Sequence, residues 1–333
     1  MITVSVQPLR HLTPILPDQV EFLIATAARA PSVHNTQPWR FRVTRYGLEL
    51  YADPARRLRV DPLGREMVIS CGAALFGLRL AIRSLGFMPQ VQIVPVSARR
   101  GLLARVGLGS PRPMDSSERQ MLAAIPHRHT HRGPFSSEPL PAGLLASLVQ
   151  DATEEGATLS FLDRDRGYEQ LADIMDTVGM GEDRDSAARA DMLKWTRSPG
   201  SPARDGVPAT AFSAVSDPHR GRLAQRDFDL GRKFGQVEGD GPAAAATAVL
   251  LTPGDNVADW LCAGQALHRV LAHAAAEWVF ASLHTQPLES AAIRALVSDR
   301  LMLPGAPQMI LQLGRARSTQ VTARRPPADL IDG

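Results

Sequence analysis

Cysteine, aromatic residues and long apolar runs are all scarce in this 333-residue sequence. Only two cysteines occur, Cys71 and Cys262, each within an apolar helical pattern, and aromatic residues make up 5%. The cysteines are better explained as small core residues than as a disulfide or metal pair, which fits a reducing cytoplasm. No basic-then-apolar signal opens the chain, and no uninterrupted apolar run reaches the ~18 residues of a membrane span. We therefore expect a cytoplasmic protein with no membrane partner.

An excess of charge of either sign is also missing. Lysine and arginine number 37 against 34 acidic residues, so the formal net charge is +3. Basic residues form no block interleaved with aromatics, which argues against a nucleic-acid partner. The apolar fraction of 44% suffices for the core of two modest domains or one large one.

Signatures of several enzyme classes are absent. There is no G-x-S-x-G for a Ser-His-Asp hydrolase and no G-x-G-x-x-G after a strand for a Rossmann site. His127, His129 and His131 alternate, but no nearby Cys, Asp or Glu completes a ligand shell. Because the adjacent arginines would also repel a cation, we expect no metal.

Hydrophobic periodicity predicts an α+β fold with mainly antiparallel sheets wrapped by helices. The expected helices cover about 18–27, 65–85, 141–151, 167–178, 185–196, 255–283 and 287–298, and the expected strands 40–43, 48–51, 91–96, 102–108, 158–162, 244–251 and 308–313.

One long segment, 197–241, has no such period and contains many prolines and glycines. Segments of this kind are usually functional lids or disordered loops. Phe212, Phe228 and Phe234 could anchor it, which favours a lid.

Two polar segments are candidates for a binding site. The first runs from Pro31 to Trp39 and carries Ser32, Asn35 and Gln37 between two prolines. An ordinary surface loop is the alternative, but Trp39 should anchor the segment to the core.

The second polar segment contains Arg128, Thr130 and Arg132, which alternate along an extended run and so project to one face. His129 would project to the other face. Arginines in a fixed fork geometry, together with a hydroxyl, suit a phosphate group.

The chain also carries the trace of a duplication. An offset of 192 residues aligns Gly72 with Gly264 on two long helices rich in small residues, and the same offset aligns Ala74, Leu75 and Leu78 with Ala266, Leu267 and Val270. Chance agreement of helical periods is the alternative. The shared order of elements favours two tandem copies, residues 1–112 and 113–333, that form a pseudo-dimer within one chain.

The whole set of motifs resembles the FMN-dependent nitroreductase superfamily, and within it the Acg-like branch of fused pseudo-dimers. The matching segments are P-S-V-H-N-T-Q-P-W at 31–39, D-P-L-G-R-E at 61–66, S-C-G-A-A-L at 70–75, H-R-H-T-H-R at 127–132 and L-P-G-A-P-Q at 303–308. Together they span nearly the whole chain.

This resemblance implies a single FMN site per chain beneath a lid. Pro31, Ser32, Asn35 and Gln37 would lie along the flavin, while Arg128, His129, Thr130 and Arg132 would hold the phosphate. Arg324 and Arg325 resemble the basic C-terminal pair that reaches the phosphate in the family. Because one chain supplies both walls, it could be monomeric.

The implied activity is reduction of nitro or quinone-like small-molecule acceptors with electrons from NADPH or NADH, in which the flavin carries the chemistry. We name no acid or base side chain. Residues 278–284 lack the glycine-containing loop that presents a backbone N–H to flavin N5 in the family. No amide for the flavin N3 edge can be assigned either. The alternative is therefore a catalytically silent protein that stores FMN.

Overall fold

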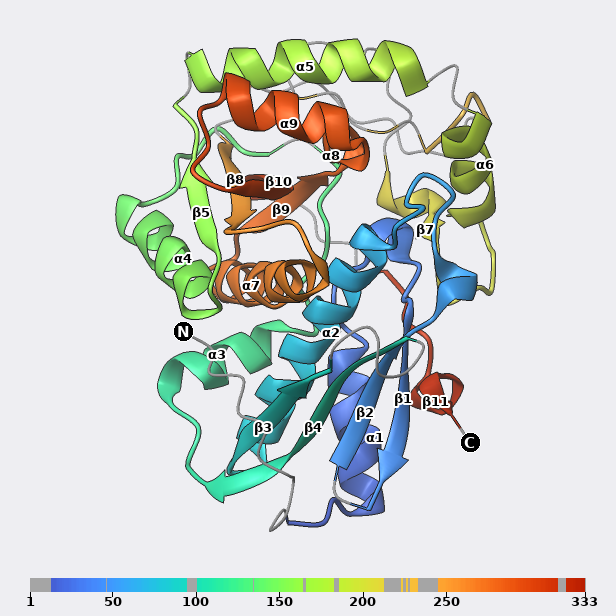
Figure 1. Ribbon diagram of the computed structural model, residues 1–333, viewed down its shortest axis with the longest axis vertical. Coiled ribbons are helices and arrows are strands. Elements are labelled where there is room, and N and C mark those ends of the chain that lie inside the picture. The colour runs from blue at the N-terminus through green and yellow to red at the C-terminus, as the bar shows by residue number, and fades with distance from the viewer. Residues whose placement is uncertain are drawn as a thin grey trace.

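A computed structural model describes residues 13–45, 47–94, 101–133, 135–163, 166–182, 186–212, 223, 226, 228–232, 245–316 and 322–332. In this structure two separate sheets lie on opposite sides of two long central helices, α2 and α7 (Figure 1).

The first sheet has five strands in the order β11-β1-β2-β4-β3. The predicted strands β1 (Trp39–Thr44) and β2 (Gly47–Ala52) pair as an antiparallel hairpin. On its other side β2 pairs antiparallel with β4 (Leu102–Pro111). The edge strand β3 covers Phe87–Ile93. The other edge comes from the far end of the chain, because β11 (Ile331–Asp332) pairs in parallel with β1.

The second sheet has four strands in the order β5-β8-β10-β9, and all of its pairs are antiparallel. Its strands are β5 (Thr158–Phe161), β8 (Ala246–Thr252), β9 (Phe280–His284) and β10 (Ala306–Gly314). Helices α5 (Arg166–Glu182) and α9 (Ala291–Arg300) lie over its outer side, where Leu171, Val297 and Ile310 share one apolar cluster (Figure 1).

The central helices are α2 (Arg65–Ser84) and α7 (Val257–Ala276), and they touch at their glycines. A Cβ on Gly72 would lie 2.3 Å from the carbonyl oxygen of Leu261, and one on Gly264 would lie 1.9 Å from that of Ile69. Only glycine allows backbones to approach so closely. The two glycines that the 192-residue offset aligns therefore face each other across this contact.

Helix α2 belongs to the interior of the protein. By length and composition it could cross a membrane, but 89% of its most apolar window is buried inside the structure. It packs against α1 (Pro17–Ala27), α7 and the first sheet, and its residues Leu75 and Leu78 are fully buried. The burial accounts for its apolar character.

Two predicted boundaries were wrong. The helix expected over 255–283 ends at Ala276, and residues 280–284 form strand β9 instead. Trp278 has a left-handed φ of 56°, which stops the helix, and the β-favouring Val279 and Phe280 follow it. Strand β3 begins at Phe87, four residues before the predicted start, directly after Gly86 with φ of 84°. The predicted residues 95–96 lie outside the described part of the chain.

Helices α4 (Ala142–Glu154) and α6 (Ser186–Trp195) agree with the predicted ranges to within a few residues, and α3 covers Ser116–Ala124. The single helix predicted over 287–298 is instead divided at Ser290, which is extended, into α8 (Gln286–Glu289) and α9. In the predicted lid, the described residues form the short parallel pair of β6 (Thr196–Arg197) with β7 (Val207–Pro208). Phe212 and Phe228 are buried there as expected, whereas Phe234 lies outside the described residues.

Candidate functional site

The polar segment at 31–39 adopts an unusual backbone conformation. His34, Asn35 and Gln37 all have left-handed φ values, of 47°, 53° and 49°. Non-glycine residues rarely do so, and such strain persists only where the surroundings hold it. Two local contacts hold it here, since the N–H of Gln37 donates to Ser32 Oγ at 3.0 Å and that of Asn35 donates to the carbonyl of Ser32. Trp39 is fully buried, so it anchors the segment as predicted.

The two amides of this segment bind other parts of the backbone. Asn35 Nδ2 donates to the carbonyls of Gly206 and Ala323 at 2.9 and 3.2 Å. Gln37 Oε1 accepts from the N–H of Arg325 at 2.8 Å, and its Nε2 donates to the carbonyl of Arg204. These amides therefore fasten the segments around 205 and 324 to the loop, and they do not line the cavity described below.

The segment at 128–132 docks on the strand that sequence reasoning took for helix. Thr130 forms a parallel bridge with Ala281 of β9, and the N–H of His131 donates to the Ala281 carbonyl at 2.8 Å. Ser282 Oγ donates to the His131 carbonyl at 2.8 Å. His129 lies with its ring against Phe280, 4.4 Å between centroids. The strand thus fixes where the two arginines of this segment point.

Three guanidinium groups gather next to this strand and the loop. Arg128 and Arg324 share an acceptor, because both donate to the carbonyl of Arg29, at 3.3 and 3.5 Å. Within the part of the chain that the structure describes, buried N–H groups have no hydrogen-bond partner at Nε and Nη1 of Arg128, Nη1 of Arg132 and Nε of Arg324. Among the described residues, none of the three arginines forms an ion pair with a carboxylate.

The electrostatics of this arginine cluster are unfavourable. Burial, together with repulsion by Arg29 and Arg132, lowers the pKa of Arg128 to about 10. Burial likewise lowers the pKa of Arg132 to about 10. The pKa of Arg324 falls well below its usual value through burial and through repulsion by Arg128, Arg29 and Arg132. Buried like charges are costly unless they are paired. A bound anion would neutralise them and accept hydrogen bonds from these N–H groups.

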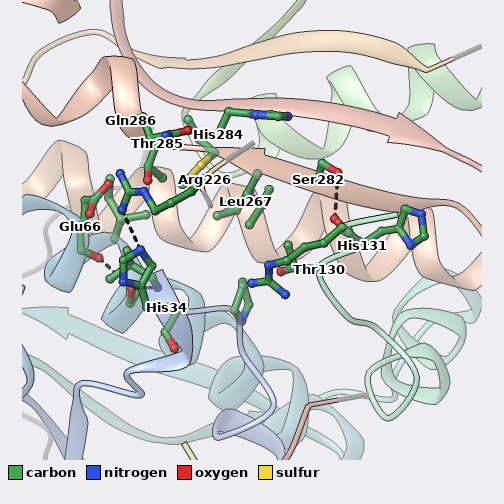
Figure 2. A pocket seen from close by; sticks show the side chains of 18 of the residues that line it. His34, Glu66, Thr130, His131, Arg226, Leu267, Ser282, His284, Thr285 and Gln286 are labelled. Carbon is green, nitrogen blue, oxygen red and sulfur yellow. Dashed lines mark hydrogen bonds between the residues drawn. The ribbon is translucent and has the colours of Figure 1, made fainter. Parts of the chain in front are cut away.

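A cavity extends from the 128–132 segment between the two halves of the fold. One side is formed by Thr130 and His131, and the opposite side by His34, Glu66 and Arg226, with Leu267 of α7 between them (Figure 2). Arg132 also lines the cavity. Pro31 and Ser32, which the resemblance places along the flavin, also line it, as do Ser282–Gln286 from β9 and α8.

The side of the cavity opposite the arginine cluster has balanced charges. Arg226 donates to Glu289 Oε1 at 2.5 Å and contacts His34 Nε2 at 2.7 Å, with its side chain 6% exposed. Phe228 packs edge-on against His34, 5.2 Å between ring centroids, and lies under the Arg132 guanidinium. Burial holds the pKa of His34 well below its ordinary value, assisted by Arg226 and Arg132, so this histidine is a neutral acceptor.

Glu66 is the buried acid of this cavity. It stands in the first turn of α2 and is 4% exposed, and neither carboxyl oxygen has a hydrogen-bond partner among the described residues. Burial, together with the negative charges of Glu289 and Asp61, raises its pKa to about 8 against the opposing effect of Arg226 and Arg65. Glu66 is therefore mainly protonated at neutral pH.

The structure distributes the ten predicted site residues over three places. Pro31, Ser32, Thr130 and Arg132 line the cavity; Arg128 and Arg324 join Arg132 in the arginine cluster; and Asn35, Gln37, His129 and Arg325 support them.

Sequence reasoning missed Glu66, His34 and Arg226. The sequence shows that Glu66 stands in the first turn of a helix of small residues, but its burial depends on contacts with segments far away in the chain. Arg226 offered no signal, since it lies in a segment without periodicity.

Neither a metal site nor a reactive thiol is found among the described residues. Within the described ranges, no group of three His, Cys, Asp or Glu side chains could hold a metal ion. Both cysteines are free; Cys71 is buried, and Cys262 Sγ donates to the Glu155 carbonyl at 2.9 Å. Burial raises the pKa of Cys262 to about 11, so its thiol is not activated.

Comparison with known proteins identifies the family. The chain is 36% identical over 308 residues to the Mycobacterium tuberculosis protein named "Putative NAD(P)H nitroreductase Rv3131", covering 90% of this chain and 86% of the relative. The chain belongs to the nitroreductase family. This confirms the resemblance that the sequence motifs indicated.

Two further likenesses accompany this relative. "Putative NAD(P)H nitroreductase acg" of the same organism is 26% identical over 319 residues, covering 94% of this chain and 95% of that protein. Among solved structures, a nitroreductase with bound FMN from Desulfitobacterium hafniense DCB-2 is similar with a TM-score of 0.41 and 12% identity, over 64% of this chain and 97% of that one. No protein-family model matches the chain.

Proposed function

We propose that this chain is an FMN-binding oxidoreductase that takes electrons from NADPH or NADH and passes them to nitro or quinone-like acceptors. The observation that carries the proposal is the arginine cluster of Arg128, Arg132 and Arg324, with buried N–H groups that lack partners beside the cavity. The phosphate of FMN is a dianion with several acceptor oxygens, and it fits this donor set. A family relative named for NAD(P)H supports the choice of electron donor.

The residues around the cavity divide the work of holding FMN. The arginine cluster would bind the phosphate, and Thr130 would supply a hydroxyl at the same side of the cavity. Pro31, Ser32 and Leu267 would flank the ring. FMN, once bound, supplies the electron transfer between donor and acceptor, and the protein contributes orientation and electrostatic tuning.

We also propose that residues 1–112 and 113–333 are the two halves of a pseudo-dimer with one FMN site. The face-to-face contact of Gly72 with Gly264 supports this division, as does the presence of one sheet on each side of the central helices. The loop at 31–37 and the arginines at 128–132 come from different halves, so one complete set arises per chain. Two FMN molecules per chain, measured by absorbance against protein concentration, would contradict it.

FMN storage is the second candidate function, because two described residues of the predicted lid lie in the cavity. Arg226 and Phe228 both reach into the cavity and contact His34, so the segment that carries them could exclude an acceptor. The two functions require the same phosphate contacts and differ in whether the ring is accessible.

Anaerobic stopped-flow mixing of the FMN-loaded protein with NADPH or NADH separates these two candidates. An oxidoreductase should bleach the flavin absorbance and recover it when a quinone is added. Flavin that stays oxidised over minutes with both donors would refute the oxidoreductase proposal and support storage. As a control, dithionite should bleach the flavin in either case.

A further inference from the structure

Glu66 lies where two cavities meet. The second cavity, about 300 Å³ in volume, opens between the start of α2 and helices α8 and α9, and its walls include Asp61, Leu63, Glu289 and Arg294. Among the described residues, Glu66 alone lines both this cavity and the proposed FMN cavity. A space of this size whose walls carry Asp61, Glu289 and Arg294 can hold water molecules. Glu66 is thus placed between a route for water and the proposed flavin ring.

The carboxyl of Glu66 has no hydrogen-bond partner among the described residues, although the side chains of Arg226 and Arg65 lie close enough to lower its pKa. Arg226 could have paired with it, but its guanidinium bonds to Glu289 and His34. Arg65 points its Nη2 group elsewhere, since this group donates to the Pro307 and Gln308 carbonyls at 3.1 and 2.7 Å, and its Nη1 has no partner among the described residues. An ionised carboxylate that is buried without hydrogen bonds would be costly, whereas a protonated one is tolerated.

We propose that Glu66 donates the proton that an acceptor takes up during its reduction in this cavity, and that the second cavity resupplies it. The inference rests on the proposed function. It adds an acid to a site whose sequence motifs named none, and it gives the unpartnered carboxyl a use.

The proton balance of a quinone acceptor requires such a group. Conversion of a quinone to a hydroquinone consumes two electrons and two protons. The two electrons and one of the protons would come from the reduced flavin as a hydride equivalent. The O–H bond of Glu66 would break as the second O–H bond of the hydroquinone forms, and water in the second cavity would reprotonate the carboxylate. For a nitro acceptor the same count gives a nitroso product and water.

The test uses FMN-loaded protein reduced with dithionite, so that it does not depend on NADPH. Mixing with a benzoquinone at a series of pH values gives the rate of flavin reoxidation. The wild-type rate should fall as the pH rises, with a midpoint near pH 8, because Glu66 loses the proton that it would donate. Glu66→Gln should lack this midpoint and react ~10²-fold more slowly, the scale of general acid catalysis.

Two further variants show whether the midpoint belongs to Glu66. The charged groups that face it are Asp61, Arg65, Arg226 and Glu289. Glu289→Gln removes a like charge and should lower the midpoint. Glu49→Gln is the matched control: Glu49 is 6% exposed but bonded to Tyr51 and Arg105 on the first sheet, so the pH profile should not move.

Infrared difference spectra provide a readout apart from turnover. At neutral pH the wild type should show the C=O stretch of a buried carboxylic acid that Glu66→Gln lacks. A Glu66→Gln variant with the wild-type rate and pH midpoint would overturn the proposal. Flavin that dithionite reduces but NADPH does not would count against the proposed function alone, and failure to bind FMN would count against both.

Discussion

The two sides of the cavity handle buried charge in opposite ways. At the arginine cluster, Arg128, Arg132 and Arg324 repel one another, and no carboxylate pairs with them in the described part of the chain. On the opposite side Arg226 pairs with Glu289, and Glu66 and His34 are held neutral. The difference teaches that the first side is built to bind an anion, while the second carries no uncompensated charge and suits an uncharged ring and proton transfer.

The comparison is tested most strongly by removing one charge from the arginine cluster. Arg128→Ala should weaken FMN binding by about 1.5–3 kcal/mol, the scale of a hydrogen bond to a charged group. Arg128→Met, which keeps more of the side-chain volume, should also raise the free energy of unfolding of the FMN-free protein, because a buried charge without a partner is lost. Fluorescence titration with FMN and thermal unfolding of the FMN-free protein measure the two effects.

A binding role for Arg128 is distinguished from a structural role by these two effects together: weaker FMN binding and higher stability of the FMN-free protein. If Arg128→Met were to destabilise the FMN-free protein, the guanidinium would be a structural group and not a binding one. Arg40→Met is a suitable control, since Arg40 forms an exposed ion pair with Asp332 on the first sheet and should change neither quantity by more than about 0.5 kcal/mol.

The comparison also assumes that α2 and α7 hold the two sides at a fixed separation. Gly264→Ala would place a Cβ 1.9 Å from the carbonyl oxygen of Ile69 and 2.7 Å from the N of Ala73. Forcing the helices apart should cost about 1–3 kcal/mol of stability, as overpacking of a core typically does. Denaturant unfolding of the FMN-free protein measures this loss.

Gly143→Ala is the matched control for the helix contact. Gly143 lies in α4, and a Cβ there would meet nothing within 4 Å. The substitution should leave stability unchanged or raise it by about 0.4–1 kcal/mol. Equal destabilisation by the two variants would mean that the Gly72–Gly264 contact does not control the spacing of α2 and α7.

Much of this architecture could be predicted from the sequence. Periodicity located α2 within one residue, and the 192-residue offset picked out the glycines that meet. Alternation along 128–132 placed Arg128 and Arg132 in one cluster. These features depend on local pattern, which a single sequence displays.

What the sequence could not show depends on contacts between distant segments. The strand β9 was read as helix because its apolar residues continue the helical pattern, and only pairing with β10 and Thr130 determines its conformation. The same holds for the amides of Asn35 and Gln37, whose partners lie about 170 and 290 residues away. The raised pKa of Glu66 follows from its burial among residues that are far apart in the chain, which no local motif encodes.

The central claim is that the arginine cluster binds the phosphate of FMN. Its most direct test compares the affinities of FMN and riboflavin, which differ only in that phosphate, for the wild type and for Arg324→Met. The wild type should bind FMN at least ~10²-fold more tightly than riboflavin, as expected for two or more charge-assisted hydrogen bonds, and Arg324→Met should lose about tenfold of that preference. Equal wild-type affinities for FMN and riboflavin would contradict the account.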